Sequence, residues 1–113
     1  MSACMKEKNK INGIELEKLL QDRRKKKTHF ILVDVREQEE YDQKHIIGVD
    51  YLIPTSVFLH KVEQLEKHKN EYIILQCRSG VRSYQVQQQL KAMNFKKAIN
   101  LEGGILSYSG KTS

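Results

Sequence analysis

The stretch that decides the fold spans residues 72–83 and reads Tyr-Ile-Ile-Leu-Gln-Cys-Arg-Ser-Gly-Val-Arg-Ser. Residues 72–75 form an apolar run of β-branched and aromatic types, which is typical of a strand buried on both faces. After a short polar loop, Val86, Leu90 and Met93 recur at the spacing of one helix face. The pattern predicts a strand, a loop with a cysteine, and a helix that runs to Met93.

The position of the cysteine, Cys77, has a chemical consequence. The first turn of a helix exposes unpaired N–H groups and the positive end of the helix dipole, so a loop that curls there binds an anion. A thiolate is an anion, and we therefore expect a lowered pKa and a nucleophilic sulfur. Arg78 and Arg82 add positive charge. Gly80 permits a turn that a side chain would obstruct, and Ser83 can cap the helix that follows.

The rest of the chain alternates between strand and helix patterns. This alternation predicts one α/β domain, with a central parallel sheet of about five strands and helices on both faces. We predict strands at residues 30–33, 49–53, 72–75 and 98–101. We predict a first helix that begins at Asn12, where Glu15 completes a capping box, and ends within residues 24–27. A second helix spans residues 37–44, and a third runs from Thr55 or Ser56 to just before Asn70. A fourth runs from the cysteine loop to Met93, with Asn94 in a left-handed C-cap. Residues 1–10 are interpreted as a flexible polar lead and residues 11–113 as the domain.

Polar side chains follow the strand at residues 30–33. Asp34 and Arg36 lie at its carboxyl end, which is the edge where open α/β sheets bind ligands. We favour a structural role for them, as a hydrogen-bonded pair that fixes a loop near the site. His45 stands in a turn and is interpreted as a packing residue. The four histidines show no metal spacing, so the sequence predicts neither a metal site nor a cofactor.

Four segments in this chain form an ordered set. They are Asp34-Val35-Arg36-Glu37 with Glu40-Tyr41; His45-Ile46-Ile47-Gly48 with Ile53-Pro54; Cys77-Arg78-Ser79-Gly80-Val81-Arg82-Ser83; and Asn100-Leu101-Glu102-Gly103-Gly104-Ile105. The third resembles the active loop of single-domain rhodaneses, the sulfurtransferases that carry a persulfide on cysteine. The other three resemble motifs of the same family in the same order. The similarity covers roughly residues 11–108 and implies a rhodanese-like fold.

The resemblance also implies an activity. Sulfane sulfur would move from thiosulfate or polysulfide to a thiophilic acceptor through a persulfide on Cys77. The substrate-binding positions that it implies are Arg78, Ser79, Gly80, Val81 and Arg82. Family members that prefer mercaptopyruvate usually lack an arginine directly after the cysteine, which favours a small anionic donor such as thiosulfate. The acceptor would be cyanide or a thiol, and a thioredoxin-like protein is one candidate.

Two other functions remain open from the residues. One is a non-catalytic rhodanese-like module that binds a partner or senses stress. The other is a cysteine phosphatase or arsenate reductase, which also places a cysteine and an arginine around an anion cradle. Resemblance indicates five residues between the two in that class, whereas Cys77 and Arg82 have four between them. The sulfurtransferase is therefore the leading hypothesis.

Composition bounds the remaining possibilities. The chain has 113 residues, 39% of them hydrophobic, and a net charge of +6, which fits one domain with an ordinary surface. No apolar run approaches the roughly 20 residues that a membrane helix needs, and no signal peptide is expected. The expected location is therefore the cytoplasm. For a chain of this size we expect a monomer. The basic residues 23–27 match the end of a helix, where positive charge is favourable, and no aromatic residues interleave with them. A nucleic-acid partner is not expected. Cys4 and Cys77 form no CxxC pair, and no disulfide is expected.

Overall fold

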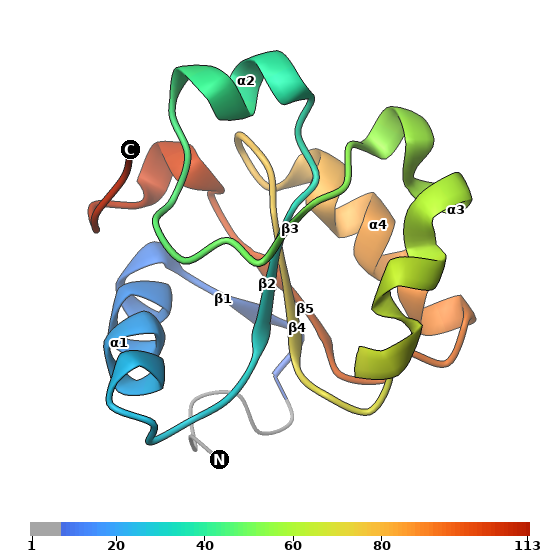
Figure 1. Ribbon diagram of the computed structural model, residues 1–113, viewed down its shortest axis with the longest axis horizontal. Helices are drawn as coiled ribbons and strands as arrows, with labels where there is room; N and C mark the ends of the chain where they lie inside the picture. The colour runs from blue at the N-terminus through green and yellow to red at the C-terminus, as the bar shows by residue number, and fades with distance from the viewer. Residues whose placement is uncertain (1–7) are drawn as a thin grey trace.

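The computed structural model describes residues 8–113. Its centre is a parallel sheet of five strands in the order β1-β5-β4-β2-β3, which confirms the predicted sheet (Figure 1). The strands are β1 (Lys10–Ile11), β2 (Ile31–Asp34), β3 (Tyr51–Leu52), β4 (Ile73–Gln76) and β5 (Ala98–Leu101). The strand that leads to Cys77, β4, lies in the middle of the sheet.

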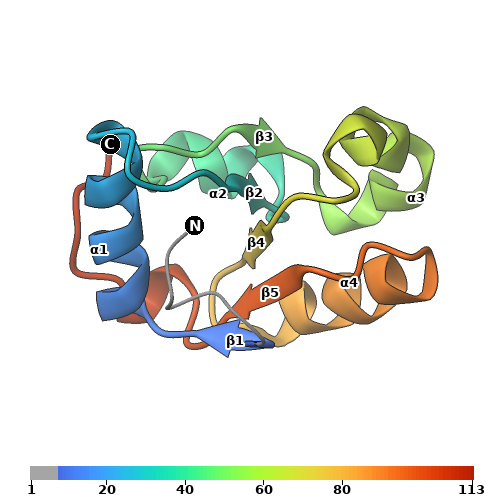
Figure 2. The same ribbon diagram turned by 90° about the horizontal axis from the view of Figure 1, so that it is seen from below.

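Helices cover both faces of the sheet, as predicted. The helices are α1 (Gly13–Arg24), α2 (Gln38–Gln43), α3 (Phe58–Lys61) and α4 (Val81–Ala92). The α1 helix and the C-terminal segment lie on one side, and α3 and α4 lie on the other (Figures 1 and 2). The short α2 helix stands beyond the carboxyl end of β2, on the same side of the molecule as the loop between β4 and α4.

The core forms two layers, one on each face of the sheet. Successive side chains of a strand point to opposite faces, so each central strand contributes to both layers. Leu32, Ile74 and Ile99 pack in one layer with the leucines of α1. Val33 and Leu75 pack in the other with α3 and α4. This burial on both faces explains why the strands read as continuous apolar runs in the sequence.

The predicted capping box at the start of α1 is present. The Asn12 side-chain oxygen accepts a hydrogen bond from the Glu15 amide at 2.8 Å, and the Glu15 carboxylate accepts one from the Asn12 amide at 3.0 Å. At the other end, Arg23 binds the Asp50 carboxylate at 2.7 Å and the Gly48 carbonyl at 2.6 Å. This arginine of the basic cluster therefore connects α1 to the segment before β3.

Three features differ from or refine the predictions. Strand β1 was not predicted, because a segment of two residues is too short to show a periodicity. Its first residue, Lys10, belongs to the segment interpreted as a flexible lead and pairs with Asn100 of β5. The rest of that lead, residues 1–7, lies outside the described residues. The predicted helix after Pro54 is a short α3 between two 3₁₀ segments, Thr55–Val57 and Val62–His68. Asn94, which follows the C-cap Met93, has a φ of 70°, and this confirms the predicted left-handed conformation at the end of α4.

Candidate active site

Cys77 lies where β4 ends and the loop to α4 begins. Its side chain is 1% exposed. Gly80 is the N-cap of α4 and has a φ of 105°, a backbone conformation that residues with side chains rarely adopt. This confirms the prediction that the loop needs glycine here. The chain turns back so tightly that the amides of Gly80 and Ser83 face the cysteine.

The sulfur of Cys77 accepts three hydrogen bonds from this turn. The donors are the Gly80 amide at 3.1 Å, the Ser83 amide at 3.4 Å and the Ser83 hydroxyl at 3.3 Å. Burial by itself raises the pKa of Cys77, but the hydrogen bonds from Ser83, Gly80 and Ser79 outweigh it, and the net pKa is lowered. This lowering of the pKa agrees with the expectation from the sequence. It increases the fraction of Cys77 that is ionised at a given pH.

Ser83 does not cap α4, so that prediction was wrong. The helix begins at Val81, three residues earlier than a Ser83 cap requires, because Gly80 is the N-cap. Ser83 therefore lies in the first helical turn, where its hydroxyl contacts the Cys77 sulfur and also the Asn100 side-chain oxygen at 2.5 Å. Its observed contacts make it part of the thiolate environment.

Asn100 is a site residue that the sequence analysis did not select. It lies in β5, next to β4, and its side-chain amide donates to the Gly80 carbonyl at 3.2 Å. It is 8% exposed in a strand whose other three residues are apolar. A polar residue in an otherwise apolar buried strand was the available signal, because buried polar groups require specific partners.

The two glycines after β5 bring the backbone against the cysteine loop. Gly104 has a φ of 56°, and a Cβ there would clash with the carbonyl oxygens of Cys77 and Arg78. The next two amides use this approach: the Ile105 amide donates to the Cys77 carbonyl at 2.9 Å, and the Leu106 amide to the Arg78 carbonyl at 3.1 Å. The close contact explains why this position requires glycine.

Arg82 forms a bidentate pair with Glu40 of α2. The two nitrogen–oxygen distances are 2.7 and 2.8 Å. The hydrogen bonds from Arg82 lower the pKa of Glu40 to about 2, against the opposing effect of burial. Arg82 thus joins the start of α4 to α2. Glu40 was not selected as a site residue from the sequence.

Asp34 and Arg36 form the expected buried pair. The Arg36 guanidinium donates to both Asp34 oxygens, at 3.0 and 2.8 Å, and also to the Lys44 carbonyl at 2.7 Å. The pair therefore ties the end of β2 to the end of α2. Nearby, the His45 ring stacks on Tyr41 with 3.9 Å between ring centroids, which is the packing contact expected of it.

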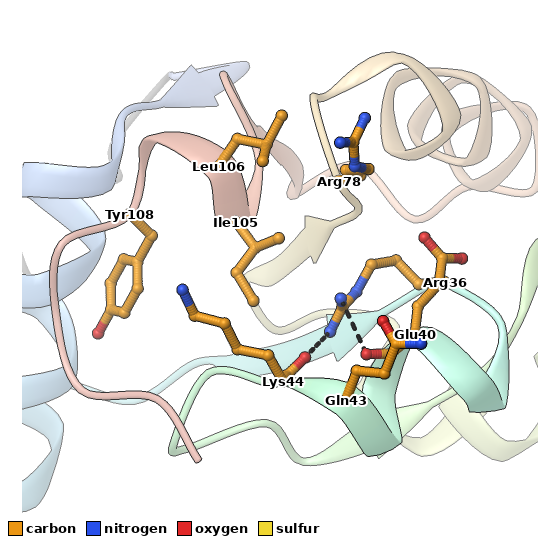
Figure 3. A pocket seen from close by; sticks show the side chains of 8 residues that line it. All are labelled: Arg36, Glu40, Gln43, Lys44, Arg78, Ile105, Leu106 and Tyr108. Carbon is orange, nitrogen blue, oxygen red and sulfur yellow. Dashed lines mark hydrogen bonds between the residues drawn. The ribbon is translucent and has the colours of Figure 1, made fainter.

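A cavity of about 290 Å³ opens beside the cysteine loop (Figure 3). It is lined by Arg36, Glu40, Gln43, Lys44, Arg78, Ile105, Leu106 and Tyr108. Arg78 is the loop residue among them, and its side chain is exposed. Ser79, Gly80 and Val81 line a second cavity of about 520 Å³. The loop thus borders solvent-filled space, although the sulfur itself is buried.

Residues 8–113 contain no group of three histidine, cysteine, aspartate or glutamate side chains placed to hold a metal ion. None of the helices described is long and apolar enough to cross a lipid bilayer. Cys4 lies outside the described residues.

The domain is thus a parallel α/β sheet with a thiol at its carboxyl edge that accepts hydrogen bonds from backbone amides. Comparison with known proteins identifies the family of this domain. A family model described as Rhodanese-like domain matches residues 15–111. The chain belongs to the rhodanese-like domain family.

Two relatives come from Bacillus subtilis. The provisionally named sulfur carrier protein YrkF is 40% identical over 81 residues, which are 72% of this chain and 42% of that protein. The provisionally named sulfurtransferase YtwF is 38% identical over 87 residues, which are 72% of this chain and 75% of that protein. The match therefore spans less than half the length of the sulfur carrier and three quarters of the sulfurtransferase.

A solved structure shows the same fold. The rhodanese-like domain protein from Staphylococcus aureus superimposes with a TM-score of 0.76 and is 28% identical. The superposition covers 91% of this chain and 93% of that protein. The similarity therefore extends over nearly the whole of both chains.

Proposed function

We propose that the chain is a sulfurtransferase that moves sulfane sulfur from thiosulfate or polysulfide to a thiophilic acceptor through a persulfide on Cys77. One observation carries the proposal: the Cys77 sulfur accepts two amide hydrogen bonds and one hydroxyl hydrogen bond at the start of α4. Membership of the rhodanese-like family and the names of the two Bacillus relatives support it.

The first step is a displacement on the donor. The Cys77 thiolate attacks the outer sulfur of thiosulfate, the sulfur–sulfur bond of the donor breaks, and sulfite leaves with the electron pair. Arg78, whose exposed side chain lines the cavity beside the loop, binds the anionic donor. The lowered pKa of Cys77 raises the fraction of thiolate available for this attack.

The second requirement is a site for the transferred sulfur. The outer sulfur of a persulfide carries negative charge, and preorganised amides stabilise such charge. The amides of Val81 and Arg82 belong to the first turn of α4, where N–H groups have no acceptor within the helix. Together with Ser79 and Gly80, they form the substrate-binding loop of the proposal. Arg82 supports this loop through Glu40.

The last step returns the enzyme to its starting state. A nucleophilic acceptor attacks the outer sulfur, takes it, and leaves the Cys77 thiolate behind. Cyanide serves as this acceptor in an assay, and a thiol serves in a cell. A thioredoxin-like protein is a candidate for the cellular acceptor. The covalent relay divides one difficult transfer into two displacements.

The test is the intact mass of the protein after incubation with thiosulfate or polysulfide. We expect a mass increase of one sulfur atom, which cyanide removes. The chain has only two cysteines, so two variants locate the adduct. Cys77→Ser should abolish the increase, whereas Cys4→Ser should retain it.

Other outcomes would favour the other functions. No adduct from either donor would contradict the sulfurtransferase and favour a non-catalytic module. Hydrolysis of a chromogenic phosphate ester that depends on Cys77 would favour a phosphatase. An adduct that persists in Cys77→Ser and disappears in Cys4→Ser would place the chemistry outside the loop and contradict the proposal.

A further inference from the structure

Lysines gather at the edge of the sheet where the strands begin. The connections that lead into β2, β4 and β5 all lie at this edge, because the strands are parallel. These three strands are neighbours, so their connections lie side by side. Figure 1 shows them at the end of the sheet away from the loop between β4 and α4. We call the following residues the lysine edge: Lys25, Lys26, Lys27, Lys67, Lys69, Lys96 and Lys97.

The two ends of the sheet differ in charge. The segments that precede β2, β4 and β5, at residues 25–29, 66–71 and 94–97, contain seven lysines and two carboxylates. At the carboxyl end of β2, residues 34–44 contain five carboxylates and two cationic side chains. The lysines are thus concentrated at one end of the molecule and not spread evenly over its surface.

Most of the lysine edge is available to a ligand. Of the two carboxylates, Glu66 pairs with Lys69 at 3.3 Å, and Glu71 contacts His68 at 2.8 Å. Within residues 8–113, the other six lysines of the edge form no ion pair with a carboxylate. All six are exposed. Their charge therefore attracts anions.

Part of the lysine edge is hollowed. A cavity of about 480 Å³ lies between the connections that lead into β4 and β5, and it is lined by Lys69, Asn70, Asn94, Lys96 and Lys97. Two of its ammonium groups stand over aromatic rings, Lys69 at 5.5 Å from the centre of Phe95 and Lys97 at 5.0 Å from that of Tyr72. The lining side chains offer ammonium and amide donors, which suit a phosphate group.

The lysine edge has no large exposed apolar side chain. Within residues 8–113, such side chains are Ile14, Ile47, Leu59, Val81, Tyr84 and Leu106, and all of them lie elsewhere. A protein interface has an apolar core, and unpaired bases are bound by stacking on aromatic rings. The edge therefore suits neither an acidic protein nor a single strand. A nucleic-acid duplex, in contrast, is bound through its phosphates by charge alone.

We propose that the lysine edge binds the phosphate backbone of a double-stranded nucleic acid without reading its base sequence. Residues 23–27 alone did not indicate such a partner. The fold changes this expectation, because it places four lysines from two other connections beside them. An anionic bilayer is also bound by charge alone, but it is flat, whereas a duplex has ridges of phosphates that fit a hollowed edge.

Fluorescence anisotropy of a fluorescein-labelled DNA duplex tests the proposal on the full chain and does not depend on sulfur transfer. The anisotropy should rise with protein concentration, and the logarithm of the binding constant should fall linearly with the logarithm of the salt concentration. A second duplex of unrelated sequence should bind equally well. A strong preference for one sequence, or no rise in anisotropy at low salt, would overturn the proposal.

Two variants locate the contact, Lys27→Gln before β2 and Lys96→Gln before β5. Each should weaken binding and reduce the slope of the salt dependence by about 1, and the double variant should reduce it by about 2. The matched control is Lys111→Gln, which removes the same charge from an exposed position near the C-terminus. This end of the chain lies beside the end of α2, where Ser113 and His45 exchange backbone hydrogen bonds, so the slope should remain that of the wild type. An equal reduction in Lys111→Gln would assign the binding to net charge and contradict a localised site.

Vesicles of phosphatidylserine and phosphatidylcholine separate the duplex from a bilayer. At a salt concentration where the duplex binds, the wild-type protein should stay in the supernatant when the vesicles are sedimented. Sedimentation with the vesicles that Lys27→Gln and Lys96→Gln both weaken would assign the lysine edge to a membrane surface and overturn the proposal.

Discussion

The lowered pKa of Cys77 depends on single hydrogen bonds, and the Ser83 hydroxyl is the clearest case. This hydroxyl has one proton and two acceptors, the Cys77 sulfur and the Asn100 side-chain oxygen. When the sulfur is ionised, donation to it is charge-assisted and therefore the stronger of the two bonds. Ser83 thus stabilises the thiolate more than the thiol.

The variant Ser83→Ala tests this bond. Removing the hydroxyl should raise the pKa of Cys77, since one of the effects that lower it is lost while burial remains. The limb of the pH–rate profile that rises with thiolate formation should move to higher pH. The rate of sulfur loading near neutral pH should fall about tenfold, the lower range for a hydrogen bond to a charged group. Thiolate absorbance as a function of pH measures the shift directly.

Ser109→Ala is the control, because Ser109 is an exposed serine beyond the site. It should leave the titration of Cys77 where it is in the wild type. An unshifted titration in Ser83→Ala would mean that the backbone amides of Ser79, Gly80 and Ser83 lower the pKa without help from the hydroxyl.

Among the elements, α2 contacts the start of α4 next to the cysteine loop, so its position affects the geometry of that loop. This helix has six residues and none of them is buried, so apolar packing contributes little to its position. Polar contacts hold it instead: the pair of Glu40 with Arg82, and the bond from Arg36 to the Lys44 carbonyl at its end. The helix is therefore coupled to α4 and β2 by charge.

The variant Glu40→Gln measures this coupling. A carboxyl whose pKa is lowered from 4.5 to about 2 stabilises the folded state above pH 4.5, and this contribution is lost as the pH falls toward 2. The pair is partly exposed, so screening limits its value to about 1 kcal/mol. Chemical denaturation should show Glu40→Gln less stable than the wild type by about this amount at pH 7, with the difference shrinking between pH 4.5 and 2.

Glu39→Gln is the matched control, since Glu39 is the exposed neighbour on the same helix. It removes the same charge without breaking the pair. An equal loss of stability in both variants would assign the effect to the net charge of α2 and not to the contact with Arg82.

In the whole molecule, the site depends on the order of the strands. Because β4 lies between β2 and β5, segments that follow both of these strands can contact the loop between β4 and α4. Asn100 and the turn at Gly104 contact it from the side of β5, and α2 contacts it from the side of β2. The environment of Cys77 is thus assembled from segments far apart in the sequence.

The variant Gly104→Ala tests this assembly. A Cβ at this position would clash with the Cys77 and Arg78 carbonyls, so the turn and the loop must separate. We expect an unfolding free energy lowered by about 1–3 kcal/mol, from the positive φ, and a loss of most sulfur loading. Denaturation and intact mass measure the two effects.

Gly103→Ala separates strain from displacement of the loop. Gly103 also has a positive φ, of 82°, but a Cβ there would meet the Oγ and Cβ of Ser107 and not the backbone of the cysteine loop. It should lose comparable stability and retain sulfur loading. Equal losses of loading in both variants would contradict the role given to the close contact at Gly104.

By itself, the sequence determined the main strands and helices of this protein and indicated Cys77 as the candidate nucleophile. Continuous apolar runs predicted the central strands, helical spacing predicted α1 and α4, and the glycine loop at a helix start indicated an activated Cys77, because these signals are local. It did not reveal β1, which is too short to show a period and forms only by pairing with β5. It also misplaced Ser83 as a cap, because one turn at Gly80 decides where α4 begins.

Only the tertiary structure decided what surrounds the sulfur. Glu40 carries no local mark of its contact with Arg82, and the polar character of Asn100 in an apolar strand does not identify its partners. The position of α2 decides the first contact, and the place of β5 beside β4 decides the second. Contacts between segments distant along the chain depend on how the sheet is ordered and packed. The choice of Cys77 as the candidate nucleophile thus rests on a local property of the chain, and the surroundings of its sulfur are a property of the fold.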